Sequence, residues 1–347
     1  MQSFVVFLTV LVGTALANPM AVTSDDLKQQ NREISSKEYL KRVFQGSDVA
    51  LVGRDSQDIV EKLNDLGLRE AATIAMEVDL RSIIRDGDVS SVTLCMPSEK
   101  AVQKWRQELP ESLRPDKKES LKNLVKAWII PERIGSTEIG DNQKVPSLNG
   151  AKLRFNIYHD GVKKVLTVNG APIVDADVTF AQGLIQVVDK VIYPLPVGDV
   201  IETLRDNFVF SVFVDFVRQA NLVNELESDP ITVLVPTIDA FLELPMDVVN
   251  DLDRDSEKLR NVLKYHVISD VRYSASLSSG QRIQASNGND IFITRDNDDQ
   301  IFLNTLADQS KTAKVIERDI PTTNGVIHVV DRVLLPVLHS RLTRPDQ

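Results

Sequence analysis

Few residues of this chain have the type and spacing that catalysis or metal binding requires. The four histidines, His159, His266, His328 and His339, share no spacing typical of a metal site. The sequence contains no GxSxG elbow, no HExxH pair and no glycine-rich phosphate loop. The one cysteine, Cys95, lies in an apolar run and is interpreted as a buried thiol, with an intermolecular bridge as the alternative. These patterns argue against an enzyme and against a bound metal ion or cofactor.

Three aspartates at alternate positions, Asp251, Asp253 and Asp255, resemble the start of a calcium-binding loop. The sixth position of such a loop needs glycine for its sharp turn, and here it is Ser256. The twelfth position needs a bidentate glutamate, and here it is Val262. We therefore interpret the aspartates as the charged start of a helix.

The length and charge of the chain limit the classes of protein to consider. Its 347 residues are enough for about two domains of about 150 residues each. The net charge of −10 argues against nucleic acid and against anionic lipid as partners, because both bind clustered Lys and Arg. Residues 1–17 are uncharged, apolar from Phe4 to Val12, and end in small residues, which predicts a cleaved secretion signal. We expect a secreted, extracellular protein that does not insert into membranes.

Two segments of the chain recur in the same order. TLCMPSEKAV at residue 93 returns as TVLVPTIDAF at 232, and GLIQVVDKVIYP at 183 returns as GVIHVVDRVLLP at 325. Pro97 corresponds to Pro236, an offset of 139 residues (236 − 97), and Pro194 to Pro336, an offset of 142 (336 − 194). A period this long indicates two copies of a whole domain rather than an array of short units.

Each copy contains the same succession of apolar patterns. Helical spacing comes first, at Ala71, Ile74, Ala75 and Val78 in one copy and at Val209, Phe213, Phe216 and Ala220 in the other. A buried strand then ends at the repeated proline, and the hydroxyl residue after it is placed to cap the next helix. Alternating segments typical of hairpins follow, and a strand apolar on both faces closes each copy. This order predicts an α+β domain, present twice.

The segments TVLVPTIDAF, LKYHVI and TTNGVIHVVDRVLLP resemble the signature segments of a fasciclin I-type domain. The second copy follows the pattern closely; the first has Ala127-Trp128 where the second has Tyr265-His266, so it is divergent. The resemblance implies two tandem domains, each a β-sandwich wedge with a group of helices. The predicted organisation is a signal peptide (1–17), an N-terminal extension (18–55), a divergent domain (56–195), a second domain (196–338) and a tail (339–347).

The same resemblance implies four receptor-binding candidates in the second copy. In similar domains a Tyr-His pair flanked by aliphatic residues is a proposed cell-receptor contact, which here is Tyr265 and His266. An aspartate followed by an aliphatic residue is implicated in integrin binding, which here is Asp319 and Ile320. The alternatives are that Tyr265 and His266 pack inward and bond to the backbone, and that Asp319 is a solvated residue before a turn.

Members of the resembling family are mostly extracellular adhesion or matrix proteins. The resemblance therefore implies a secreted adhesion or matrix protein that binds a cell-surface receptor, with an integrin as one candidate, or a matrix component. An exposed aspartate suits an integrin because integrins coordinate a ligand carboxylate through a divalent cation. The alternative is a structural protein that self-associates, or one that carries a small apolar ligand. Neither reading requires a cofactor or a catalytic residue.

Overall fold

The computed structural model describes residues 58–87, 90–108, 118–160, 163–205, 207–305 and 312–336. All of them belong to one compact unit, residues 56–347. The predicted secretion signal, the N-terminal extension and the C-terminal tail lie outside the described residues.

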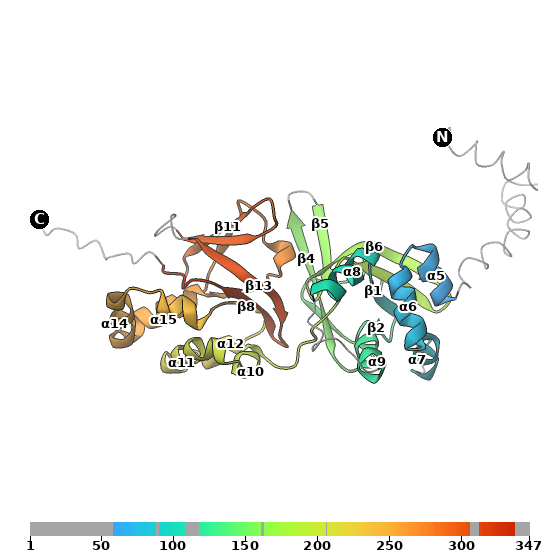
Figure 1. Cartoon of the computed structure of the whole chain (residues 1–347), viewed down its shortest axis with the longest axis horizontal. Helices are drawn as coiled ribbons and strands as arrows, with labels where there is room; N and C mark the ends of the chain where they lie inside the picture. The colour runs from blue at the N-terminus through green and yellow to red at the C-terminus, as the bar shows by residue number, and fades with distance from the viewer. Residues whose placement is uncertain are drawn as a thin grey trace, which may run out of the picture. The chain divides into compact units, whose positions relative to one another are not determined.

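The first domain combines helices with a seven-stranded sheet of order β2-β1-β7-β6-β5-β4-β3 (Figure 1). Its elements are α5 (Ile59–Asp65), α6 (Arg69–Glu77), α7 (Leu80–Asp86), β1 (Val92–Pro97), α8 (Glu99–Glu108), α9 (Lys118–Ala127), β2 (Ile129–Ile130), β3 (Gln143–Pro146), β4 (Lys152–Asp160), β5 (Lys163–Val168), β6 (Ala171–Phe180) and β7 (Gly183–Val188).

The second domain repeats this arrangement with the sheet order β10-β11-β12-β13-β14-β8-β9. Its elements are α10 (Val200–Arg205), η2 (Phe208–Phe210), α11 (Ser211–Gln219), α12 (Val223–Leu226), β8 (Ile231–Pro236), α13 (Ile238–Leu242), α14 (Met246–Arg254), α15 (Ser256–Tyr265), β9 (Val267–Ile268), η3 (Ser274–Ser276), β10 (Arg282–Gln284), β11 (Asp290–Arg295), β12 (Ile301–Thr305), β13 (Ala313–Pro321) and β14 (Gly325–Val330). Figure 1 shows α11, α12, α14 and α15 gathered on one side of these strands.

Equivalent strands pair in the same way in both domains. The strand that ends at the repeated proline is parallel to the closing strand, β1 to β7 and β8 to β14. All four of these strands are buried along their whole length, as expected for a strand covered on both faces. The sequence prediction of two α+β domains with a buried closing strand is confirmed.

The repeated proline and hydroxyl residue form a strand-to-helix corner in both copies. Thr237 precedes α13, and its side chain accepts a hydrogen bond from the amide of Ala240 at 3.2 Å. Ser98 precedes α8 and accepts one from the amide of Ala101, also at 3.2 Å. Each hydroxyl satisfies a backbone N–H that the first turn of a helix leaves without a partner, as the sequence predicted.

The predicted apolar helical stripe of the second domain is only partly correct. Phe213 and Ala220 are buried, whereas Phe216 is half-buried. Val209 is 40% exposed, so its expected place in the core is wrong. The reason is local: Val209 lies in η2, whose tighter turn shifts its side chain off the stripe that α11 continues.

Gly325 starts β14 where that strand lies against β8, and it leaves no room for a side chain. A Cβ at this position would lie 1.8 Å from the carbonyl oxygen of Ile231. We predict that Gly325→Ala lowers the free energy of unfolding by about 3 kcal/mol, because the two buried strands must separate. Chemical denaturation measures the change.

Gly140→Ala is the control, because its new Cβ would lie 3.6 Å from the nearest atom, the flexible side chain of Gln143. It should change the free energy of unfolding by less than about 1 kcal/mol. Equal effects of the two substitutions would contradict the role assigned to Gly325.

Buried polar groups connect the two domains. Arg154 on β4, whose side chain is only 4% exposed, donates to a carboxylate oxygen of Asp229 at 3.0 Å. The hydroxyl of Tyr158 donates to the carbonyl of Val271 at 3.0 Å and accepts from the amide of Tyr273 at 3.3 Å. Arg154, Tyr158 and Tyr273 are buried, so these bonds hold residues of both domains against one another.

Candidate functional site

Tyr265 and His266 end α15 and are both buried. The hydroxyl of Tyr265 donates to the carbonyl of Asp290 at 2.8 Å. Nδ1 of His266 lies 2.8 Å from the carbonyl of Val262, and Nε2 accepts from the amide of Leu334 at 3.0 Å. Both side chains therefore pack inward and bond to the backbone, the alternative to an exposed receptor contact.

His266 is neutral in the folded chain because both ring nitrogens are committed. Nδ1 donates and Nε2 accepts, so a second proton would remove the acceptor of the Leu334 amide. Burial lowers the pKa of His266 to about 4, although the bond to the Val262 carbonyl opposes that shift. The imidazole is a structural link between α15 and the segment after β14.

Trp128 takes the place of His266 in the first domain and makes the corresponding link. Its indole Nε1 donates to the carbonyl of Ile192 at 3.2 Å. Ile192 corresponds to Leu334, 142 residues later (334 − 192). The two domains thus use different side chains for one task, which explains how the first copy can diverge at this position and keep the fold.

Asp319, expected to be exposed before a turn, is buried on β13, so that expectation is wrong. Its carboxylate accepts from the amide of Ser274 at 2.6 Å and from the Ser274 hydroxyl at 2.5 Å. It also forms an ion pair of 3.1 Å with Lys190 of the first domain. Burial raises the pKa of Asp319, but the charges of Lys190 and His328 and the bonds from Ser274 outweigh it, so the pKa is lowered.

Asp177 repeats this arrangement in the first domain. Asp177 and Asp319 both adopt a left-handed backbone conformation, with φ of 60° and 63°. Asp177 accepts from the amide and hydroxyl of Ser136, at 2.8 and 2.5 Å. Its own amide donates to Gln186, as the amide of Asp319 donates to His328. Recurrence in both domains identifies the aspartate as a structural element of the fold.

Ile320, the fourth predicted site residue, is half-buried and packs on the apolar core of the second domain. Of the four predicted site residues, only Asp319 lines a cavity. Tyr265, His266 and Ile320 are core residues of the same domain.

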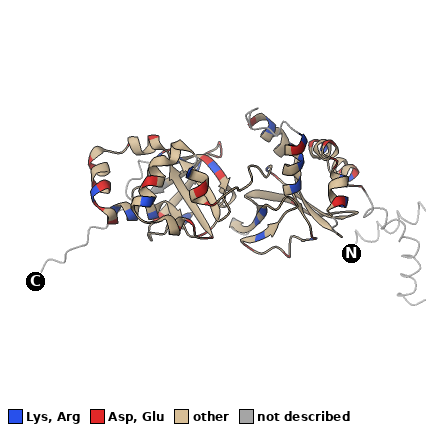
Figure 2. Cartoon of the chain, turned by 90° about the horizontal axis from the view of Figure 1, so that it is seen from below, with Lys and Arg blue, Asp and Glu red and all other residues tan. Residues whose placement is uncertain are grey.

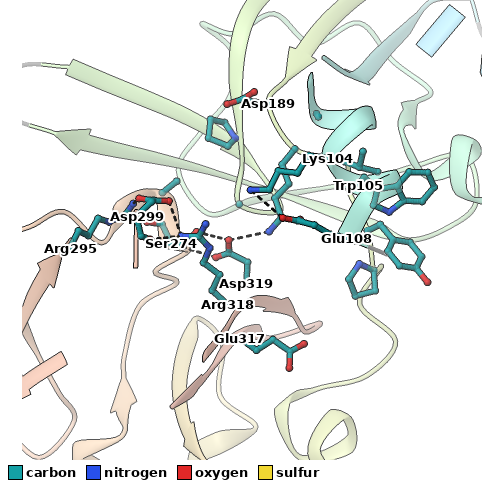
Figure 3. A pocket seen from close by; sticks show the side chains of 18 residues that line it. Lys104, Trp105, Glu108, Asp189, Ser274, Arg295, Asp299, Glu317, Arg318 and Asp319 are labelled. Carbon is teal, nitrogen blue, oxygen red and sulfur yellow. Dashed lines mark hydrogen bonds and ion pairs between the residues drawn. The ribbon is translucent and has the colours of Figure 1, made fainter. Parts of the chain in front are cut away.

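A cleft of about 860 Å³ lies beside Asp319 and is lined by both domains (Figure 3). The first domain contributes Lys104, Trp105 and Glu108 from α8, together with Lys190. The second contributes Ser274, Arg295, Asp299 and the β13 residues 317–319. This volume lies in the range of protein ligand sites.

Charged side chains of both signs pair along this cleft. Lys104 and Glu108 lie 3.7 Å apart, and Arg318 lies 3.0 Å from Asp299. Asp299 also pairs with Arg295. A cleft lined in this way suits a polar or charged partner better than an apolar one.

Sequence reasoning missed the exposed residues on the same strand. Ile316 and Glu317 are both exposed, and Glu317 extends away from the ion pairs beside Asp319 (Figure 3). Two register shifts interrupt the pairing of β13 with β14, one between Val315 and Glu317 and one between Glu317 and Ile320. They break the alternation of inward and outward side chains, so strand alternation alone does not predict which carboxylate of β13 is exposed.

The first domain has the same exposed pair, Val174 and Asp175, on β6. Register shifts also flank Asp175 in its pairing with β7. The signal that could have found both pairs is the repeat itself, because Val174-Asp175 and Ile316-Glu317 occupy equal positions 142 residues apart (316 − 174).

The structure contains no cluster of metal-ligating side chains within the residues it describes. Asp251 pairs with Lys258 at 3.0 Å, and Asp255 caps α15 by accepting from the amides of Glu257 and Lys258. Only Asp255 starts a helix, as predicted, whereas Asp251 and Asp253 lie near the C-terminal end of α14, so the prediction of a helix start is wrong for those two. None of the described helices has the length and apolar character of a membrane span.

Cys95 is buried in β1, as predicted, and burial raises the pKa of its thiol to about 12. The thiol is therefore protonated at neutral pH and is a poor nucleophile.

Comparisons with known proteins match residues 67–194 and 209–336 to the model of the Fasciclin domain. Pig transforming growth factor-beta-induced protein ig-h3 is 29% identical over 227 residues, 65% of this chain and 31% of that protein. Human periostin is 28% identical over 250 residues, 71% of this chain and 28% of that protein. The chain thus spans about three tenths of the length of these two relatives.

A bacterial relative is also similar. Protein sll1483 of Synechocystis is 35% identical over 140 residues, which cover 40% of this chain and 73% of that protein. A solved FAS1 domain pair from the insect cell adhesion molecule fasciclin I covers 77% of this chain and 96% of its own, at 20% identity and a TM-score of 0.36.

Proposed function

Because the chain belongs to the fasciclin family, with two Fasciclin domains in tandem, we propose that it is a secreted adhesion or matrix protein. It binds a cell-surface receptor or a matrix component without catalytic turnover. The observation that carries this proposal is the double family match, which covers most of the described residues. Its similarity to ig-h3 and periostin supports the same class.

The exposed Ile316-Glu317 pair on the edge of the cleft is the proposed receptor contact. A receptor of the integrin kind requires a carboxylate that can reach a bound divalent cation. Glu317 is exposed and meets this requirement, whereas Asp319 is buried and already bonded to Ser274 and Lys190. Asp319 acts as a positioning residue for this edge, because it links β13 to Ser274 and to Lys190.

The alternative proposal, a carrier of a small apolar ligand, has weaker support because charged side chains line the cleft. Self-association in a matrix is compatible with the same fold, and sedimentation measures it directly.

We predict that Glu317→Ala reduces attachment of cells to the immobilised chain at least fivefold, because the exposed carboxylate is lost. Chelation of divalent cations should reduce attachment to the wild-type chain to a similar extent. A cell-attachment assay on surfaces coated at equal density measures both effects.

Asp175→Ala is the matched control, because it removes the exposed carboxylate at the equivalent position of the divergent first domain. Circular dichroism verifies that both variants are folded. Full attachment to the Glu317→Ala surface would refute the assignment of this residue.

A further inference from the structure

The second domain exposes two large apolar side chains where α13 gives way to α14. Leu242, the last residue of α13, is 76% exposed, and Met246, the first of α14, is 72% exposed. Leu244 lies between them, half-buried against the core of the domain. Leu242, Leu244 and Met246 together form an apolar patch. The patch lies outside the set of residues that line the cleft.

The fold itself does not require apolar residues at these positions. The repeat aligns Leu242 with Gln103 (242 − 103 = 139) and Met246 with Gln107 (246 − 107 = 139). Both glutamines are exposed, as Leu242 and Met246 are, so the two domains have the same pattern of exposure here. The first domain folds with polar side chains at these two positions. The apolar side chains of Leu242 and Met246 are therefore not needed for the fold and require another explanation.

The charges around the patch also differ from those of the first domain. From residue 238 to 253 the chain carries five acidic residues and no Lys or Arg; the acidic residues are Asp239, Glu243, Asp247, Asp251 and Asp253. The equivalent helix α8 has acidic and basic residues mixed. Figure 2 colours the acidic residues of these helices red. The patch is thus apolar at its centre and acidic around it.

The acidic residues around the patch favour some classes of partner over others because of their charge. Two copies of the same patch would bring like charges together, and an anionic lipid surface would repel them. A protein surface with apolar side chains flanked by Lys and Arg matches both the apolar centre and the charge. We propose that the apolar patch binds a protein partner of this kind.

The proposal is tested with the full chain and two synthetic amphipathic peptides, one of Leu and Lys and one of Leu and Glu. The wild-type chain should bind the Leu/Lys peptide and leave the Leu/Glu peptide unbound. The double variant Leu242→Gln and Met246→Gln, which copies the first domain, should bind the Leu/Lys peptide about tenfold more weakly at unchanged net charge. Fluorescence anisotropy measures all these affinities.

Two further variants separate the contributions to binding. Glu243→Gln with Asp247→Asn keeps the patch and removes its charge, and it should also weaken binding several-fold. This second variant tests the proposal even if the double glutamine variant does not fold. Val174→Gln removes an exposed apolar residue from the first domain and should bind as the wild type does.

Three results would overturn the proposal. The first is equal affinity of the wild-type chain and both patch variants for the Leu/Lys peptide. The second is a wild-type dimer in sedimentation that the double glutamine variant loses, which would make a second copy the partner. The third is binding of phosphatidylserine vesicles that depends on Leu242 and Met246, which would make the surface a membrane contact.

Discussion

Asp319→Ala is expected to lower the free energy of unfolding by about 3 kcal/mol. The substitution leaves the amide of Ser274 buried without its acceptor and removes the partner of Lys190. It also places alanine at a φ of 63°, a left-handed conformation that aspartate and asparagine tolerate better. Urea denaturation followed by circular dichroism measures the loss.

Asp319→Asn is the conservative variant, because its amide oxygen still accepts from Ser274 and the backbone remains unstrained. It should cost about 1 kcal/mol, mainly from loss of the ion pair with Lys190. Asp177→Ala should cost less than Asp319→Ala, because Asp177 is only half-buried. If Asp319→Ala were as stable as the wild type, the carboxylate would have no structural role.

The second large effect is a loss of stability in mild acid. Folding lowers the pKa of His266 from its ordinary value of 6.5 to about 4. Between these values the unfolded chain binds a proton that the folded chain does not, so stability falls as the pH falls. A shift of about 2.5 units corresponds to about 3 kcal/mol, present above pH 6.5 and lost by pH 4. Urea denaturation at a series of pH values measures it.

His266→Gln isolates this contribution, because glutamine does not titrate. The variant should be less stable at neutral pH and should lose less stability on acidification than the wild type. Burial also lowers the pKa of His328, whose contribution has the same sign and remains in both proteins. Parallel stability curves for the two proteins would show that His266 is not the residue that titrates.

The architecture was predictable because the repeated segments are the buried strands and corners of the fold. Pro97 and Pro236 end strands, and Ser98 and Thr237 start helices, so short-range rules apply to them. The local conformation at such residues depends mainly on their neighbours in the chain. The fold class and the double domain follow from them directly.

The environment of the candidate site was less predictable because long-range contacts create it. Asp319 is bound by Lys190, 129 residues earlier (319 − 190), and by Ser274 across the domain. The register shifts in β13 then turn Glu317 outward and Asp319 inward. No local pattern contains this information, and the equal geometry of Asp177 is visible only in the structure.

Cell attachment to Glu317→Gln and to Asp319→Asn, compared at equal coating density, decides which of the two carboxylates the receptor binds. Both substitutions remove one carboxylate, but Glu317 is exposed and Asp319 is buried. Attachment is expected to fall on the Glu317→Gln surface and to persist on the Asp319→Asn surface. Loss of attachment on a folded Asp319→Asn surface, with full attachment on Glu317→Gln, would show that Asp319 and not Glu317 is the receptor contact.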